Sequence, residues 1–156
     1  MTIDLHMASV HPQENLYEED FNLWILSTVN QIKEKDFGLV DWENLVEELE
    51  SLGRSDKREL ENRLTVLLEH LLKLAYWKEE REANARGWLL TIIEQRRRIR
   101  RLLKDSPSLK SFVQEILFEC YQDALVNASI VSGLDIFPGE SPFTLEDILH
   151  PDYLPE

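Results

Sequence analysis

Apolar side chains recur every three or four residues along most of the chain, and this spacing predicts helices. The first apolar face is formed by Tyr17, Phe21, Trp24, Ile25, Thr28 and Ile32. Asn15 and Glu18 have the three-residue spacing of a capping box, and Gly38 follows the last apolar position. We therefore expect a first helix that starts near Asn15 and ends just before Gly38.

A short second helix is predicted within DWENLVEELESLG, residues 41–53. Asp41 has the chemistry of an N-cap, and Gly53 is typical of a helix C-terminus. The apolar stripe of this helix consists of Trp42, Leu45, Val46, Leu49 and Leu52. We expect the helix to end at Gly53.

A third helix is predicted from just after Ser55 to about Glu82, and a break at Gly87 separates it from a fourth helix. The third helix has a narrow leucine seam of the kind that packs in bundles, formed by Leu60, Leu64, Leu67, Leu71 and Leu74. The fourth helix is defined by the periodic residues Trp88, Ile92, Gln95, Ile99 and Leu102.

Ser106-Pro107 predicts the start of a fifth helix, which should end before Gly133. Its apolar stripe consists of Leu109, Phe112, Val113, Ile116, Cys120, Ala124 and Ala128. Thr144 and Asp147 then predict one short capped turn of helix near the C-terminus.

Alternation with a period of two is absent from the sequence over any useful length, so no strand is expected. Short connections favour antiparallel neighbours. The predicted fold is an all-α antiparallel bundle of four long helices, with a short second helix and a short C-terminal helical turn. Residues 1–14 are expected to be a flexible tail, and residues 15–156 a single helical-bundle domain.

Five consecutive motifs resemble those of the bacterial DUF29 family in the same order. They are DWENLVEELESLGRS, RELENRLTVLLEHLLK, WLLTIIEQRRRI, DSPSL and FPGESPFTLEDIL. The resemblance spans roughly residues 16–156. It implies a helical domain, and it implies no activity, ligand or catalytic residue, because the family is named for its unknown function.

Charge is distributed unevenly along this chain of net charge −13. Residues 1–50 contain twelve acids and two bases, residues 83–110 eight bases and two acids, and residues 111–156 nine acids and no base. Such a layout favours association of the basic segment with acidic segments, within the chain or in a partner. The single cysteine, the lack of a signal-peptide pattern and the lack of an 18-residue apolar run predict a soluble cytoplasmic protein without a membrane span.

His70 is the first candidate for chemistry, because it lies on the flank of the leucine seam. An imidazole there can act as a base or a ligand if a carboxylate of Glu48, Glu50 or Glu94 reaches it. The alternative is a structural hydrogen bond between the histidine and a glutamate. The sequence has no Glu-x-x-His pair, P-loop, Gly-x-Gly-x-x-Gly or Gly-x-Ser-x-Gly motif, so we expect no metal and no cofactor.

The arginine block of the fourth helix is the second candidate. Opposite the apolar seam the helix presents Arg97, Arg100, Arg101 and Lys104, while Arg96 and Arg98 fall on the borders of that face. Three interpretations remain open: a solvated face paired with the chain's own carboxylates, a protein interface that includes a homodimer, and a site for nucleic acid or another polyanion. The pI of about 4.7 disfavours the last.

Together these observations favour a non-enzymatic, cytoplasmic module that binds a protein partner or a second copy of itself. Polyanion binding by the fourth helix is one alternative. A metal-dependent or hydrolytic site around His70 and the nearby glutamates is the other.

Overall fold

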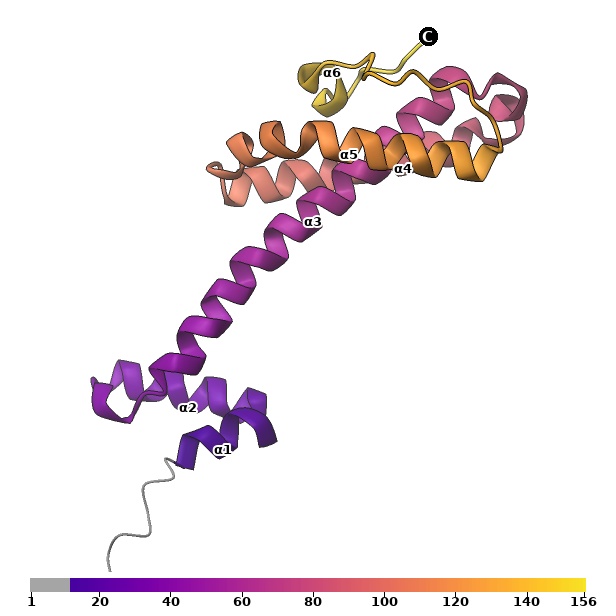
Figure 1. Cartoon of the computed structure of the whole chain (residues 1–156). Coiled ribbons are helices and arrows are strands. Elements are labelled where there is room, and N and C mark those ends of the chain that lie inside the picture. Colours follow the sequence, from indigo (N-terminus) through magenta and orange to yellow (C-terminus); the bar gives the residue numbers. More distant parts are fainter. Residues whose placement is uncertain (1–11) are drawn as a thin grey trace, which may run out of the picture. The chain divides into compact units, whose positions relative to one another are not determined.

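The computed structural model describes residues 12–156, where every regular element is a helix and no strand occurs (Figure 1). The predicted all-α class is therefore confirmed. The chain divides into two compact units, Met1–Gly53 and Arg54–Glu156. Most of the predicted flexible tail, residues 1–11, lies outside the described residues, and the first helix begins at Pro12. Across residues 12–156, no helix is both long enough and apolar enough to cross a membrane.

The N-terminal unit begins with two helices where the sequence predicted one. They are α1 (Pro12–Glu19) and α2 (Phe21–Lys33), and the 3-10 turn η1 (Phe37–Leu39) follows. Asp20 separates the helices: its backbone is not helical, and its Oδ1 accepts a hydrogen bond from the Leu23 N–H at 2.9 Å. The prediction of a single helix was wrong because this carboxylate caps α2 and thereby starts a new helix.

Aromatic side chains form the small core of this unit. Trp24 is buried, and the ring of Tyr17 meets it edge-on with 4.9 Å between the ring centroids. The Tyr17 hydroxyl donates a hydrogen bond to Glu48, which lies in the helix that follows η1. Thr28 and Val40 complete the buried set.

The third helix, α3 (Trp42–Tyr76), is continuous through Gly53, so the predicted stop there was wrong. A glycine ends a helix well when it adopts a left-handed conformation. Gly133 is the glycine with a positive φ among the described residues, and Gly53 keeps a helical backbone. Glycine inside a helix costs only about 1 kcal/mol relative to alanine, which the buried leucines further along α3 readily offset.

The break between α3 and α4 (Lys78–Asp105) lies at Trp77 rather than at the predicted Gly87. Arg81, in the first turn of α4, donates hydrogen bonds to the Leu74 carbonyl near the end of α3, one of them from Nε at 2.7 Å. That carbonyl lies in the last turn of α3, where the helix offers it no partner of its own. The arginine therefore stabilises a chain reversal that no glycine or proline marks.

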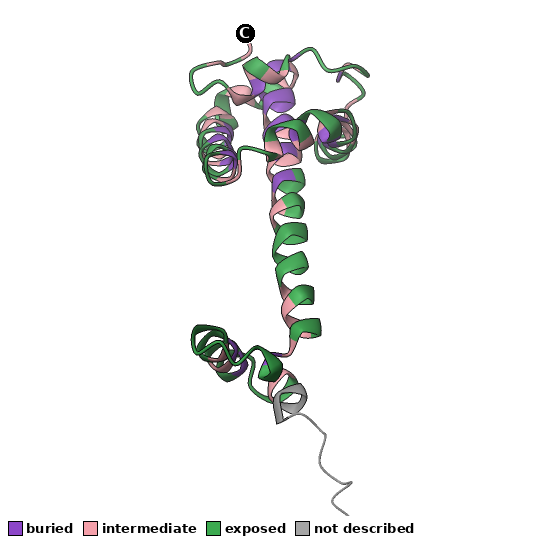
Figure 2. Cartoon of the chain, turned by 90° about the vertical axis from the view of Figure 1, so that its left-hand side faces the viewer, coloured by how far each residue is buried: buried purple, intermediate pink, exposed green. Residues whose placement is uncertain are grey.

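The C-terminal unit is built around α3. The C-terminal half of this helix runs between α4 and α5 (Leu109–Ser132), as Figures 1 and 2 show. All five predicted seam leucines of α3 are buried, which confirms the seam. The core residues that meet them from the neighbouring helices include Ile92, Ile99, Val113, Ile116 and Ala124.

The end of α5 and the following short helix agree with the sequence pattern. Gly133 has a φ of 68° and directly follows α5, and Thr144 caps α6 (Leu145–Leu149) by accepting a hydrogen bond from the Asp147 N–H at 3.1 Å. The start of α5 differs slightly. Ser106 ends α4, and α5 begins at Leu109 instead of at Pro107.

Arg96 is the main surprise of this unit, because the sequence placed it at the border of the exposed face of α4. Its exposed fraction is only 1%. The guanidinium donates to the carbonyl oxygens of Ile148 (2.8 Å), Tyr153 (2.7 Å) and Asp147 (3.2 Å). Two of these carbonyls lie in the last turn of α6, where only that of Asp147 also accepts a backbone hydrogen bond, from the His150 N–H. One buried cation thus binds both the end of α6 and the chain beyond it.

Replacing Arg96 with methionine should therefore lower the free energy of unfolding by about 2–4 kcal/mol, because buried carbonyls lose a charged donor. It should also expose residues 134–156 to limited proteolysis. Arg100→Met provides the control, since Arg100 is exposed on the same helix. Urea denaturation that finds equal losses for both variants would contradict this role of Arg96.

Candidate functional site

His70 lies on α3 in the C-terminal unit and is partly buried. Its Nδ1 is 2.8 Å from the carbonyl oxygen of Val66, one turn earlier in the same helix. Burial lowers the pKa of His70, while the bond to Val66 opposes this shift. The neighbouring Lys73 and Glu69 pair with each other at 2.7 Å. The polar contact of His70 is thus made with its own helix.

The three glutamates proposed to serve His70 have other environments. Glu48 accepts the Tyr17 hydrogen bond within the N-terminal unit, and Glu50 also belongs to that unit. Glu94 lies on α4, where Arg97 and Arg98 bind it. Within residues 12–156, no three His, Cys, Asp or Glu side chains are grouped so as to hold a metal ion.

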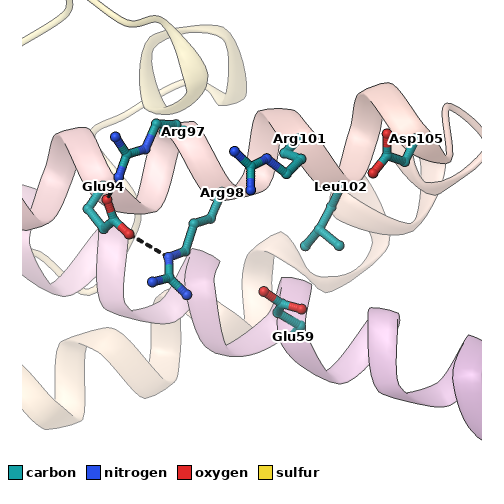
Figure 3. Close-up of a pocket in the computed structure, with 7 residues that line it drawn as sticks. All are labelled: Glu59, Glu94, Arg97, Arg98, Arg101, Leu102 and Asp105. Atoms are coloured by element: carbon teal, nitrogen blue, oxygen red, sulfur yellow. Dashed lines mark hydrogen bonds and ion pairs between the residues drawn. The ribbon is translucent and has the colours of Figure 1, made fainter.

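A pocket of about 380 Å³ runs along the side of α4 that faces α3 (Figure 3). Glu94 forms one end of the pocket and binds Arg97 together with the Nε of Arg98, the latter at 2.5 Å. The bond from Arg98 is the main reason that the pKa of Glu94 is lowered. The full lining is Glu59, Glu94, Arg97, Arg98, Arg101, Leu102 and Asp105.

The charges of this pocket balance. Three guanidinium groups share it with three carboxylates, which lie around them in Figure 3. An anion that entered would therefore meet attraction and repulsion at short range. Two of the arginines already pair with Glu94, and such exposed pairs are each worth at most about 1 kcal/mol. The pocket offers no excess of positive charge to a polyanion.

The outer face of α4 is different, because its exposed residues combine apolar and basic chemistry. Leu90 and Ile93 are 63% and 56% exposed. At helical spacing with them lie the exposed basic residues Arg86, Arg97, Arg100, Arg101 and Lys104. We call these seven residues the basic stripe, and two of them, Arg97 and Arg101, also line the pocket. Within the described residues, Arg100, Arg101 and Lys104 make no hydrogen bond or ion pair, so this part of the predicted face points to solvent.

Exposed large hydrophobic side chains are concentrated in the N-terminal unit. Twelve of its large hydrophobic side chains are 37–64% exposed. Six lie on α2 (Phe21, Leu23, Ile25, Leu26, Val29 and Ile32). The others are Phe37, Leu39, Trp42, Val46, Leu49 and Leu52.

The last four of these residues fall on one side of α3. Glu43, Glu47 and Glu50 border them on the same helix. We call Trp42, Val46, Leu49 and Leu52 with these three glutamates the acidic stripe. Figure 2 shows the corresponding turns of α3 as exposed, whereas turns near the C-terminal end of the same helix are buried.

Sequence periodicity found the apolar residues of the acidic stripe, but it could not show that they stay exposed. Leu90 and Ile93 were missed. Their signal was that they share a helical face with Arg97 and Arg101 instead of with the seam around Ile92.

The His70 environment predicts a pH effect on stability. Burial disfavours the charged imidazolium of His70 in the folded state, so its pKa there is below the ordinary value of about 6.5. As the pH falls below about 6.5, His70 is protonated in the unfolded state before it is protonated in the folded state, and this favours unfolding. Wild-type protein should therefore lose stability between about pH 7 and pH 5. His70→Gln should lose less over the same interval in urea titrations at the two pH values. An equal loss in both proteins would contradict the burial of His70 as the cause.

Comparison with known proteins places the chain in one family. No curated protein and no solved structure matches it. A family model described as "Domain of unknown function DUF29" matches residues 16–154, which is nearly the whole chain and both of its units. The resemblance inferred from the motifs is confirmed: the chain belongs to the DUF29 family.

Proposed function

We propose that this chain is a non-enzymatic interaction module whose N-terminal unit presents an apolar surface to another polypeptide. The observation that carries the proposal is the set of twelve large hydrophobic side chains exposed between Phe21 and Leu52. Single exposed hydrophobic residues are ordinary, but a contiguous apolar surface typically marks an interaction site. Burial of such a surface is worth about 25 cal/mol per Å².

The acidic stripe has the form of a helix that docks by one face. Trp42, Val46 and Leu49 follow one another at spacings of four and three residues, the pattern of anchors in helix-in-groove recognition. Trp42 donates its Nε1 hydrogen bond to the Phe37 carbonyl at 3.0 Å, and its side chain is about half exposed. A tryptophan held in this way loses little freedom when a partner covers it.

The other two functions have less support. The Nδ1 of His70 contacts the Val66 carbonyl of its own helix, and Glu94 accepts hydrogen bonds from Arg97 and Arg98. The two side chains therefore do not form a common catalytic or metal site. The α4 pocket contains as many carboxylates as guanidinium groups, and the exposed basic face includes the apolar pair Leu90 and Ile93, which favours a protein partner over a polyanion. We also propose a cytoplasmic location, because Cys120 is a buried free thiol of the kind common in reducing compartments.

Site-specific photo-crosslinking in the native host tests the proposal without assuming a partner. A benzoylphenylalanine at Leu49 should yield a covalent adduct of discrete mass, because Leu49 lies in the acidic stripe. Ser51 provides the matched control, since it is exposed on the opposite side of the same helix. Ser51 should give several-fold less adduct. No adduct from Leu49, or equal yields from both positions, would overturn the proposed function.

A further inference from the structure

We propose that the polypeptide covering the acidic stripe is a second copy of this chain, and that it docks there with its basic stripe. This inference rests on the proposed function and names the partner. It is carried by two exposed surfaces that both contain apolar side chains and that have opposite charge.

The acidic stripe suits a partner that combines apolar side chains with positive charge. Its four apolar side chains are at least 49% exposed, and Glu43, Glu47 and Glu50 lie beside them. The unit around it is strongly acidic. Residues 1–53 contain twelve acidic residues and two basic ones.

The basic stripe combines exposed apolar side chains with the opposite charge. Leu90 and Ile93 form an exposed apolar pair, Arg86 precedes them by one helical turn, and Arg97 follows them by one turn on the same face. Arg100, Arg101 and Lys104 continue the positive charge beyond them. A helix laid along this stripe can bury apolar side chains against Leu90 and Ile93 and bring carboxylates close to the arginines on either side of them.

Electrostatic repulsion disfavours contact between the acidic stripes of two copies. Two N-terminal units would each bring a large negative charge to such an interface, and like charges across an interface are costly. The basic stripe belongs to the one segment of the chain with a large positive excess, eight bases against two acids in residues 83–110. Contact of unlike stripes therefore gains from electrostatic attraction as well as from apolar burial.

The inferred contact is heterologous, because it joins two different surfaces of the same chain. Such contacts occur twice in a reciprocal dimer, or once per copy in a ring or a filament. The area buried between two single helix faces is small for a stable complex. An assembly in which the contact occurs more than once is therefore more stable than a single contact.

A mixing experiment isolates this contact. One variant, Val46→Arg with Leu49→Arg, disables the acidic stripe. The other, Leu90→Glu with Ile93→Glu, disables the basic stripe. In a solution of either variant alone, every contact between copies includes one altered stripe. In an equimolar mixture, the intact acidic stripe of the Leu90→Glu, Ile93→Glu variant can bind the intact basic stripe of the Val46→Arg, Leu49→Arg variant. All four positions are exposed, and thermal midpoints close to that of wild type serve as the control for folding.

Sedimentation equilibrium should find wild-type protein self-associated at about 100 µM, with an association that weakens as salt is raised. Each variant alone should be monomeric, with self-association weakened about 100-fold, and the mixture should form a one-to-one complex. A monomeric wild-type protein, an α4 variant that still associates, or a mixture that stays monomeric would each overturn the inference.

The crosslinked peptide from Leu49 separates this inference from the proposed function. A crosslink to the 86–104 segment of the same sequence supports the inference. A crosslink to a different protein overturns it and leaves the proposed function intact. The absence of any crosslink overturns both.

Discussion

The burial of one face of α3 is the constraint on which the C-terminal unit depends. Leu60, Leu64, Leu67 and Leu71 are fully buried between α4 and α5, and they supply the centre of its core. The same helix begins with an apolar stripe of equal regularity, from Trp42 to Leu52, that stays exposed. One continuous helix thus contains an apolar stripe that the chain itself buries and a second apolar stripe that stays exposed.

The arginine block shows how one short run of sequence takes on separate roles. A helix turns by about 100° per residue, so consecutive arginines point in different directions. Arg96 is buried and holds the carbonyls at the end of α6, while Arg97 and Arg98 bind Glu94. Arg100 and Arg101 face outward. These two arginines, together with Arg86, Arg97 and Lys104, make up the exposed positive face of α4.

The sequence predicted the buried seam, the end of α5 and the cap of α6, because each depends on local chemistry. The leucines repeat at helical spacing, Gly133 takes a left-handed backbone, and Thr144 binds an N–H three residues ahead. Gly53 failed as a signal because glycine breaks a helix only where the chain gains from another conformation. The true boundary at Trp77 depends on Arg81 reaching the Leu74 carbonyl, a contact that no periodicity reveals.

The environments of Arg96, His70 and the acidic stripe were harder to predict than the helices, because each depends on how the folded chain packs around it. Arg96 meets carbonyls 51 to 57 residues away, so its burial depends on how the C-terminal segment packs. For His70 the sequence proposed glutamates, whereas the structure gives it the Val66 carbonyl. The exposure of the acidic stripe likewise depends on whether another part of the folded chain packs against it. The sequence of the stripe alone does not show this.

Amide hydrogen exchange across a series of protein concentrations tests the central claim most directly, that the two parts of α3 differ in what covers them. The account predicts that residues 60–74 exchange slowly at every concentration. Residues 42–52 and 86–101 should slow together as concentration rises, by about tenfold or more, because association closes both stripes. Exchange in residues 42–52 that is as slow as in the leucine seam at the lowest concentration, or that never changes with concentration, would contradict it.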